Sequence, residues 1–78
     1  NLAAFHAASG EGYRLLADAV IEIDAFNGQT AARMVGPLCQ WRRQTPARAG
    51  LMRAELERVL AAPECSRLVG EKGRLALG

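Results

Sequence analysis

The chain has 78 residues, a formal net charge of +2 and a hydrophobic content of 50%, which fits one small domain and excludes recognition of a polyanion by net charge alone. Its two cysteines are too few for a disulfide framework and suit a reducing compartment. No apolar run approaches the ~20 residues of a membrane span and no secretory signal is visible at the N-terminus, so we expect a cytoplasmic chain with no membrane partner.

The first predicted helix spans residues 13–27. The run before it, from Ser9 to Gly12, is typical of a loop because two glycines flank Glu11. Apolar residues then recur at three- and four-residue spacing, namely Leu16, Val20, Ile23 and Phe26. This pattern predicts an amphipathic helix with Asp24 on its exposed side.

The second predicted helix spans residues 29–43. Asn27 and Gly28 end the first helix, and the Asn27 side chain is suited to cap the second. The apolar positions of this second helix are Ala31, Met34, Val35, Leu38 and Trp41. Pro37 lies inside it, where proline removes one backbone hydrogen bond and crowds the preceding turn. We therefore expect a kink or an early end at Pro37.

The third predicted helix spans residues 46–62. Thr45 is placed as its N-cap, and Pro46 occupies the first helical position, where a missing N–H costs nothing. Its apolar stripe consists of Leu51, Met52, Leu56, Val59 and Leu60. Arg53 and Glu57 are spaced to pair on the outside.

A fourth helix is predicted for residues 66–77. Leu68, Val69, Lys72 and Leu75 have helical spacing. Gly70 and Gly73 weaken this prediction, because each glycine costs ~1 kcal/mol relative to alanine in a helix.

The expected fold class is all-α. No segment alternates between apolar and polar residues for long, so no strand is predicted. Short connections make successive helices antiparallel, and the four helices therefore form hairpins stacked in a bundle or a solenoid.

Few residues could carry catalysis or bind a metal. A zinc hydrolase needs several converging ligands, usually two histidines one turn apart plus a carboxylate, and His6 is the single histidine. We expect His6 to bond to local backbone, and Cys39 and Cys65 to be buried thiols that act as small hydrophobic groups. No catalytic residue, metal site or cofactor is predicted for this chain.

A basic cluster beside a tryptophan is the main feature that could bind nucleic acid. Arg42, Arg43 and Arg48 lie near Trp41, a combination that can stack on and neutralise a single strand. Acidic residues follow soon after and the total charge is near neutral, so a solvated helix end is the preferred interpretation. Trp41 is expected to fill a gap between helices.

Four segments together resemble one known family. They are Ala4-Phe5-His6-Ala7, Gly10-Glu11-Gly12-Tyr13, Asn27-Gly28-Gln29-Thr30-Ala31-Ala32-Arg33 and Met52-Arg53-Ala54-Glu55-Leu56-Glu57. In order and spacing they look like the extreme C-terminal region of bacterial aminopeptidase N, whose members are zinc metallopeptidases of the M1 class. The similarity covers nearly the whole chain.

The resemblance implies that residues 1–78 form one helical segment at the C-terminal end of the C-terminal domain, an ARM- or HEAT-like α-solenoid. In the family this domain packs on the catalytic domain and closes off the chamber through which peptides reach the zinc. The zinc motif and the exopeptidase motif belong to another domain, and neither is present here. The chain is therefore expected to be inactive on its own, within a parent that removes N-terminal amino acids.

Gln29 and Arg33 match family residues on the helix end that faces the chamber, so the resemblance implies that they line it. The two are four residues apart and share a helical face. Arginine offers a planar fork of donors for a carbonyl or carboxylate. The competing interpretation is that Arg33 pairs with an acidic neighbour and Gln29 is an ordinary first-turn residue. Gly28, where proline is common in the family, would make this helix start more flexible.

Two classes of function remain open at this stage. The first is a non-catalytic scaffold whose partners are the remaining domains of the parent. Such a scaffold would contact peptide substrate only where it lines the chamber. The alternative is a stand-alone helical module that binds a protein or nucleic acid. A segment cut from a solenoid exposes the face that its neighbours cover, so we expect the isolated chain to self-associate.

Overall fold

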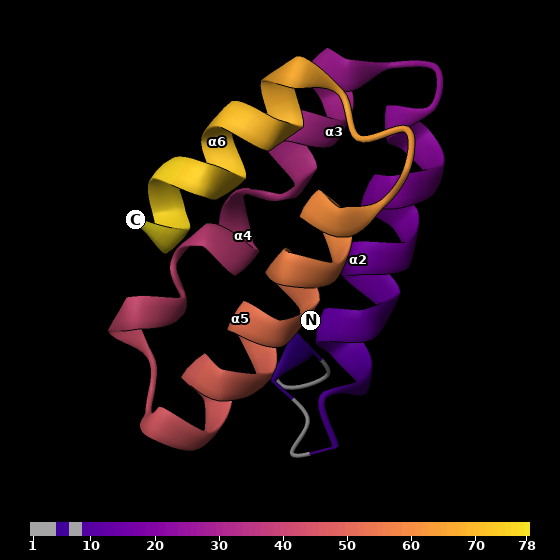
Figure 1. Ribbon diagram of the computed structural model, residues 1–78. Coiled ribbons are helices and arrows are strands. Elements are labelled where there is room, and N and C mark those ends of the chain that lie inside the picture. Colours follow the sequence, from indigo (N-terminus) through magenta and orange to yellow (C-terminus); the bar gives the residue numbers. More distant parts are fainter. Residues whose placement is uncertain (1–4, 7–8) are drawn as a thin grey trace.

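Two helical hairpins are stacked on each other in the computed structural model, which describes residues 5–6 and 9–78 (Figure 1). The helices in chain order are α2 (Glu11–Asp24), α3 (Gly28–Met34), α4 (Gly36–Cys39), the 3-10 helix η1 (Trp41–Arg43), α5 (Pro46–Ala61) and α6 (Arg67–Leu77). The described residues include no strand. The predicted all-α class of stacked antiparallel hairpins is confirmed.

The hairpins stack so that equivalent helices lie side by side. Helix α2 packs against α5 in one layer, and α3 and α4 pack against α6 in the other (Figure 1). The core between the layers consists of ten buried hydrophobic residues: Tyr13, Ala17, Val20, Ala31, Val35, Leu38, Met52, Leu56, Val59 and Val69. Every long helix contributes to this core, so neither hairpin has a separate core of its own.

Helix α2 begins two residues earlier than predicted, at Glu11. Gly10 has a φ of 77°, a left-handed conformation that glycine adopts without steric cost, and its carbonyl accepts the Arg14 N–H at 3.1 Å. Glu11 lies in the first turn, where a carboxylate interacts favourably with the helix dipole. The loop interpretation of Glu11 and Gly12 was therefore wrong.

The buried face of α2 also differs from the predicted stripe. Asp24 was placed on the surface but is buried, with 8% of its area exposed, whereas Phe26 is 76% exposed. Helix α2 ends at Asp24 rather than at residue 27, so Phe26 lies past the turn that would have carried it to the core. The observed face is Tyr13, Ala17, Val20 and Asp24.

The predicted helix 29–43 is divided into α3, α4 and η1. Its division follows from Pro37, which has no N–H to continue the helical ladder. The chain restarts with Leu38 N–H donating to the Val35 carbonyl at 3.0 Å. The expected kink or early end is confirmed, and it begins at Val35, two residues before the proline.

Helix α5 (Pro46–Ala61) lies close to the predicted 46–62. Thr45 is its N-cap residue and its carbonyl accepts the Ala49 N–H at 2.8 Å, but its side chain makes no capping bond. Arg53 and Glu57 pair on the outside as predicted, at 3.9 Å.

Helix α6 forms in spite of its two glycines. Ser66 is its N-cap and its hydroxyl accepts the Val69 N–H at 3.3 Å. Gly70 and Gly73 face the core and are buried, and a Cβ on Gly73 would lie 2.6 Å from Leu60 Cδ2 of α5. The lower helix propensity of Gly73 is therefore offset by the close approach of α6 to α5 that it permits.

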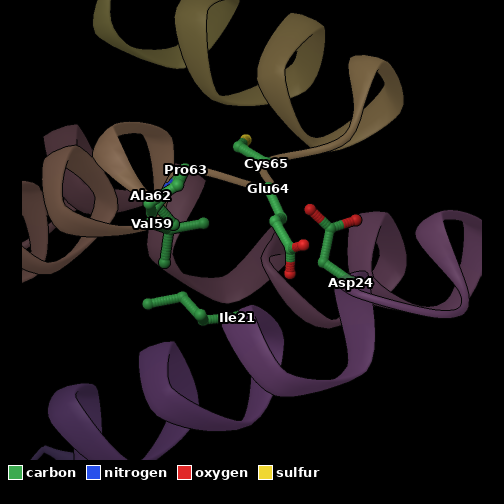
Figure 2. A pocket seen from close by; sticks show the side chains of 7 residues that line it. All are labelled: Ile21, Asp24, Val59, Ala62, Pro63, Glu64 and Cys65. Atoms are coloured by element: carbon green, nitrogen blue, oxygen red, sulfur yellow. The ribbon is translucent and has the colours of Figure 1, made fainter.

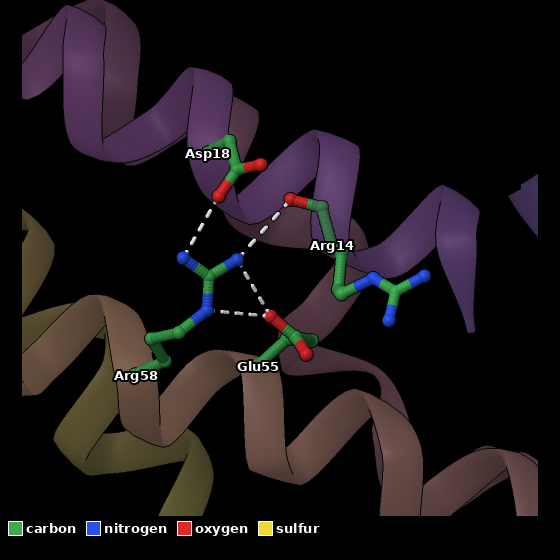
Figure 3. A network of polar contacts seen from close by, with 4 residues as sticks. All are labelled: Arg14, Asp18, Glu55 and Arg58. Atoms are coloured by element: carbon green, nitrogen blue, oxygen red, sulfur yellow. Dashed lines mark hydrogen bonds and ion pairs between the residues drawn. The ribbon is translucent and has the colours of Figure 1, made fainter.

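A polar network joins the exposed edges of α2 and α5 (Figure 3). Arg58 pairs with Asp18 at 2.8 Å and with Glu55 at 2.8 Å, and it donates to the Arg14 carbonyl at 3.3 Å. The hydrogen bond that Arg58 donates to Glu55 is the main cause that raises the pKa of Arg58. Because Arg58 and Asp18 are exposed and water screens their charges, the network contributes about 1 kcal/mol or less.

Candidate functional site

Helix α3 carries the two residues that the family resemblance implies face a substrate, Gln29 in its first turn and Arg33 in its last turn. Asn27 precedes it, and its Oδ1 accepts the Thr30 N–H at 3.1 Å, which confirms the predicted cap. Such a cap is worth about 1 kcal/mol. Gln29 and Arg33 therefore project from a helix whose first turn is held in place.

A buried carboxylate ties this region to the start of α6. Asp24 Oδ2 accepts the Ser66 N–H at 2.6 Å, while Oδ1 has no hydrogen-bond partner in the described structure. A Cβ on Gly28 would lie 3.0 Å from the Ser66 hydroxyl. The sequence interpretation of Gly28 as a source of flexibility missed this contact, because glycine here lets α3 begin directly against the cap of α6.

Gln29 and Arg33 are both exposed on α3. Neither makes a side-chain hydrogen bond or ion pair to any residue that the structure describes. The competing interpretation, in which Arg33 pairs with an acidic neighbour, receives no support. Gln29 and Arg33 are four positions apart on one helix, so their side chains can contact the same ligand.

Among the described residues His6 bonds to a side chain, where a bond to local backbone was predicted. Its Nδ1 lies 2.6 Å from the hydroxyl of buried Tyr13, and Phe5 packs edge-on against both rings. The bond ties the segment before α2 to the core. Ala4 and Ala7, which contribute to the family resemblance, lie outside the described residues.

The two cysteines are half-buried, less than predicted, and both are free. Burial raises the pKa of the Cys39 thiol, an effect that Lys72 partly offsets. Burial and the charge of Asp24 raise the pKa of Cys65, and Arg74 lowers it. A raised pKa leaves little thiolate at neutral pH, so neither cysteine is an activated nucleophile.

Trp41 fills a gap between helices, as predicted. Its Nε1 donates to the Ala76 carbonyl at the end of α6 at 3.2 Å. Arg42 lies 4.8 Å and Arg53 5.3 Å from the ring centroid, and Arg42 also donates to the Leu77 carbonyl at 3.0 Å. The ring is therefore already contacted by two guanidinium groups of its own chain, which leaves less of it for stacking on a base.

A cavity of about 260 Å³ lies between the ends of α2 and α5 and the segment before α6 (Figure 2). Its lining residues are Ile21, Asp24, Val59, Ala62, Pro63, Glu64 and Cys65. The sequence analysis missed it. The available signal was Asp24 itself, which continues the four-, three- and four-residue spacing of Tyr13, Ala17 and Val20 and so belongs on the buried face.

Residues 5–6 and 9–78 show neither a metal-binding cluster nor a membrane-spanning helix. Across this part of the chain no three His, Cys, Asp or Glu side chains lie close enough to hold a metal ion. No helix in it combines the length and apolar character needed to cross a membrane.

Comparison with known families gives a match over the entire chain. A family model described as a domain of unknown function (DUF3458_C) with ARM repeats matches residues 1–78. This description agrees with the stacked hairpins of Figure 1, since ARM repeats stack helices into a solenoid.

Curated relatives that match the chain are named aminopeptidase N. The protein from Caulobacter vibrioides is 53% identical over 78 residues, or 100% of this chain. Those from Haemophilus influenzae and Escherichia coli are 42% and 36% identical over 77 residues, or 99% of it. The match covers 9% of each relative, so the chain spans less than a tenth of their length.

Proposed function

Because the chain belongs to the DUF3458_C family of ARM repeats and is matched over its own whole length by aminopeptidase N, we propose that it is a non-catalytic scaffold segment of a zinc aminopeptidase. Membership confirms the family resemblance and the α-solenoid class inferred from the sequence. The proposed parent is a cytoplasmic M1 metallopeptidase that removes N-terminal amino acids from peptides. Its zinc would be held by another domain, and no step of the chemistry is assigned to this chain.

The observation that carries this proposal is 53% identity over the full chain to a protein about ten times longer. Exposed apolar side chains on and just after α2 support it. Leu15 is 61% exposed, and Phe26, two residues past the end of α2, is 76% exposed. Large exposed apolar side chains of this kind are typical of a contact surface. We assign these side chains to packing against the remainder of the parent.

Gln29 and Arg33 are proposed to line the substrate chamber of the parent. Both are exposed, and Arg33 has no counter-ion among the described residues. A guanidinium with free donors can bind a peptide carbonyl or C-terminal carboxylate through two parallel hydrogen bonds. The capped start of α3 would hold both side chains at a fixed place on the chamber wall.

Kinetics of the full-length protein that carries this segment test the chamber role. Loss of a hydrogen bond to a charged group costs about 1.5–3 kcal/mol, so Arg33→Ala should lower kcat/KM roughly 10- to 100-fold. Arg33→Lys keeps the charge without the fork and should recover part of the loss. Arg48→Ala removes another exposed arginine, on α5, and is the matched control. Values for Arg33→Ala within twofold of the unmodified enzyme would exclude Arg33 from the chamber.

Assays of the isolated chain test the scaffold role. A non-catalytic segment should neither hydrolyse an alanine anilide nor retain zinc after dialysis. Stoichiometric zinc, or turnover by a pure preparation, would overturn the assignment.

A further inference from the structure

The cavity at the ends of α2 and α5 is lined by apolar and acidic side chains, and no basic side chain of this chain lines it to neutralise the acids. Four of its seven lining residues (Ile21, Val59, Ala62 and Pro63) are apolar, and its two charged lining residues are both acidic, Asp24 and Glu64. No lysine or arginine lines it. This composition contrasts with the net charge of +2 of the chain.

The two carboxylates are held differently. Asp24 is 8% exposed and uses Oδ2 to accept the Ser66 N–H, while Oδ1 has no hydrogen-bond partner in the described structure. Glu64 is exposed and forms no ion pair within the described residues. Figure 2 shows the side chains of both acids approaching each other across the cavity, with Cys65 above them.

Arg74 is the basic group of this chain that acts on the region. It lies near enough to Cys65 to lower the pKa of that thiol. Its guanidinium, however, lies over Gly70, where a Cβ would be 3.0 Å from Nη1, and it does not line the cavity. The negative charge of Glu64 is therefore available to pair with a basic group from outside this chain.

We propose that this cavity is a socket for one basic side chain, lysine or arginine, supplied by the part of the aminopeptidase that lies outside these 78 residues. A volume of about 260 Å³ is below the ~300–1,000 Å³ of small-molecule pockets, and suits a single side chain. The long aliphatic stem of a lysine or arginine packs on apolar surface while its head stays at a polar edge. Here the stem would contact Val59 and Ile21, and the head would meet Glu64.

The socket rests on the proposed function, because it requires that the segment packs on a larger parent. It adds a specific electrostatic contact to the apolar contact proposed for Leu15 and Phe26. A cation placed beside Glu64 at a partly buried site is attracted more strongly than at an open surface, because water screens the two charges less.

Hydrogen exchange in the full-length protein tests the socket. The reporter is the segment from Ala62 to Ser66, whose Cys65 N–H donates to the Ala62 carbonyl at 3.1 Å. If a basic side chain is seated there, Glu64→Lys should speed exchange of this segment at least about tenfold after correction for intrinsic rates, and Glu64→Gln should speed it less. Glu64→Asp keeps the charge and should stay within about twofold of the unmodified protein.

Glu57→Lys is the matched control, because Glu57 is an exposed acid of α5 outside the cavity. It should leave exchange at 62–66 unchanged. Equal exchange in Glu64→Lys and the unmodified protein would overturn the socket, as would an equal effect of Glu57→Lys.

A second variant, Phe26→Asp, distinguishes a wrong socket proposal from a wrong scaffold proposal. If Phe26→Asp speeds exchange of α2 while Glu64→Lys changes nothing at 62–66, only the socket is wrong. If neither substitution has an effect, packing of this segment on the parent is wrong as well.

Discussion

Replacing Gly73 with alanine tests whether α6 needs a glycine to approach α5. The new Cβ would lie 2.6 Å from Cδ2, 3.0 Å from Cγ and 3.1 Å from Cδ1 of Leu60. Because three side-chain atoms are too close, Leu60 must change rotamer or α6 must move outward. Overpacking of this kind costs about 1–3 kcal/mol, and the higher helix propensity of alanine offsets about 1 kcal/mol of it. We expect Gly73→Ala to lower the free energy of unfolding by about 1 kcal/mol.

Gly50 provides a matched control for the same chemical change. It lies in α5, is exposed, and a Cβ there would have no heavy atom within 4 Å. Gly50→Ala should therefore raise the free energy of unfolding by up to about 1 kcal/mol. Urea titration of the isolated chain, followed by far-ultraviolet circular dichroism, measures both values.

A double-mutant cycle identifies the cause. Leu60→Ala removes the atoms that the new Cβ would meet, so Gly73→Ala in that background should stabilise the chain as Gly50→Ala does. The coupling between the two positions should then be about 2 kcal/mol, within the range measured for residues in contact. If Gly73→Ala stabilises the unmodified chain, or if the coupling is absent, the close approach of α6 to α5 is refuted.

Three further outcomes are expected. Asp24→Ala should lower the free energy of unfolding by about 1.5–3 kcal/mol in urea titration, because the Ser66 N–H loses a charged acceptor. A decrease no larger than that of exposed Asp18→Ala would contradict this. Burial raises the pKa of Cys39 and Cys65 above the ordinary 9.0. The stability linked to these thiols is therefore present below pH 9.0 and is lost as pH rises through the raised pKa. Replacing both cysteines with serine should flatten this loss of stability at alkaline pH. The isolated chain should self-associate in sedimentation, and Phe26→Asp should make it monomeric.

Most of the detailed features predicted correctly from the sequence are local. The Asn27 cap, the break at Pro37 and the Arg53–Glu57 pair each involve residues within four positions of one another. Capping, proline geometry and helical spacing act over that distance, so a single sequence is enough to detect them. The choice of buried face in α2 was less secure, because Leu16 and Ile23 compete with Ala17 and Asp24 for the same role.

The residues misread from the sequence lie where helices meet: Gly73 inside the second hairpin, and Gly28 and Asp24 at the junction of the two hairpins. Gly73 contacts Leu60 of α5, Gly28 contacts Ser66, and Asp24 binds a backbone N–H that is 42 positions away in sequence. Each looks unfavourable within its own helix and is explained only by a neighbour that periodicity does not reveal. The cavity beside Asp24 arises from the same junction, as do the positions of α3 and α6 relative to each other. The start of α3, which carries Gln29, is therefore set by contacts between hairpins, and substitutions at Asp24 or Gly28 should disturb the proposed chamber wall, which neither residue is proposed to line.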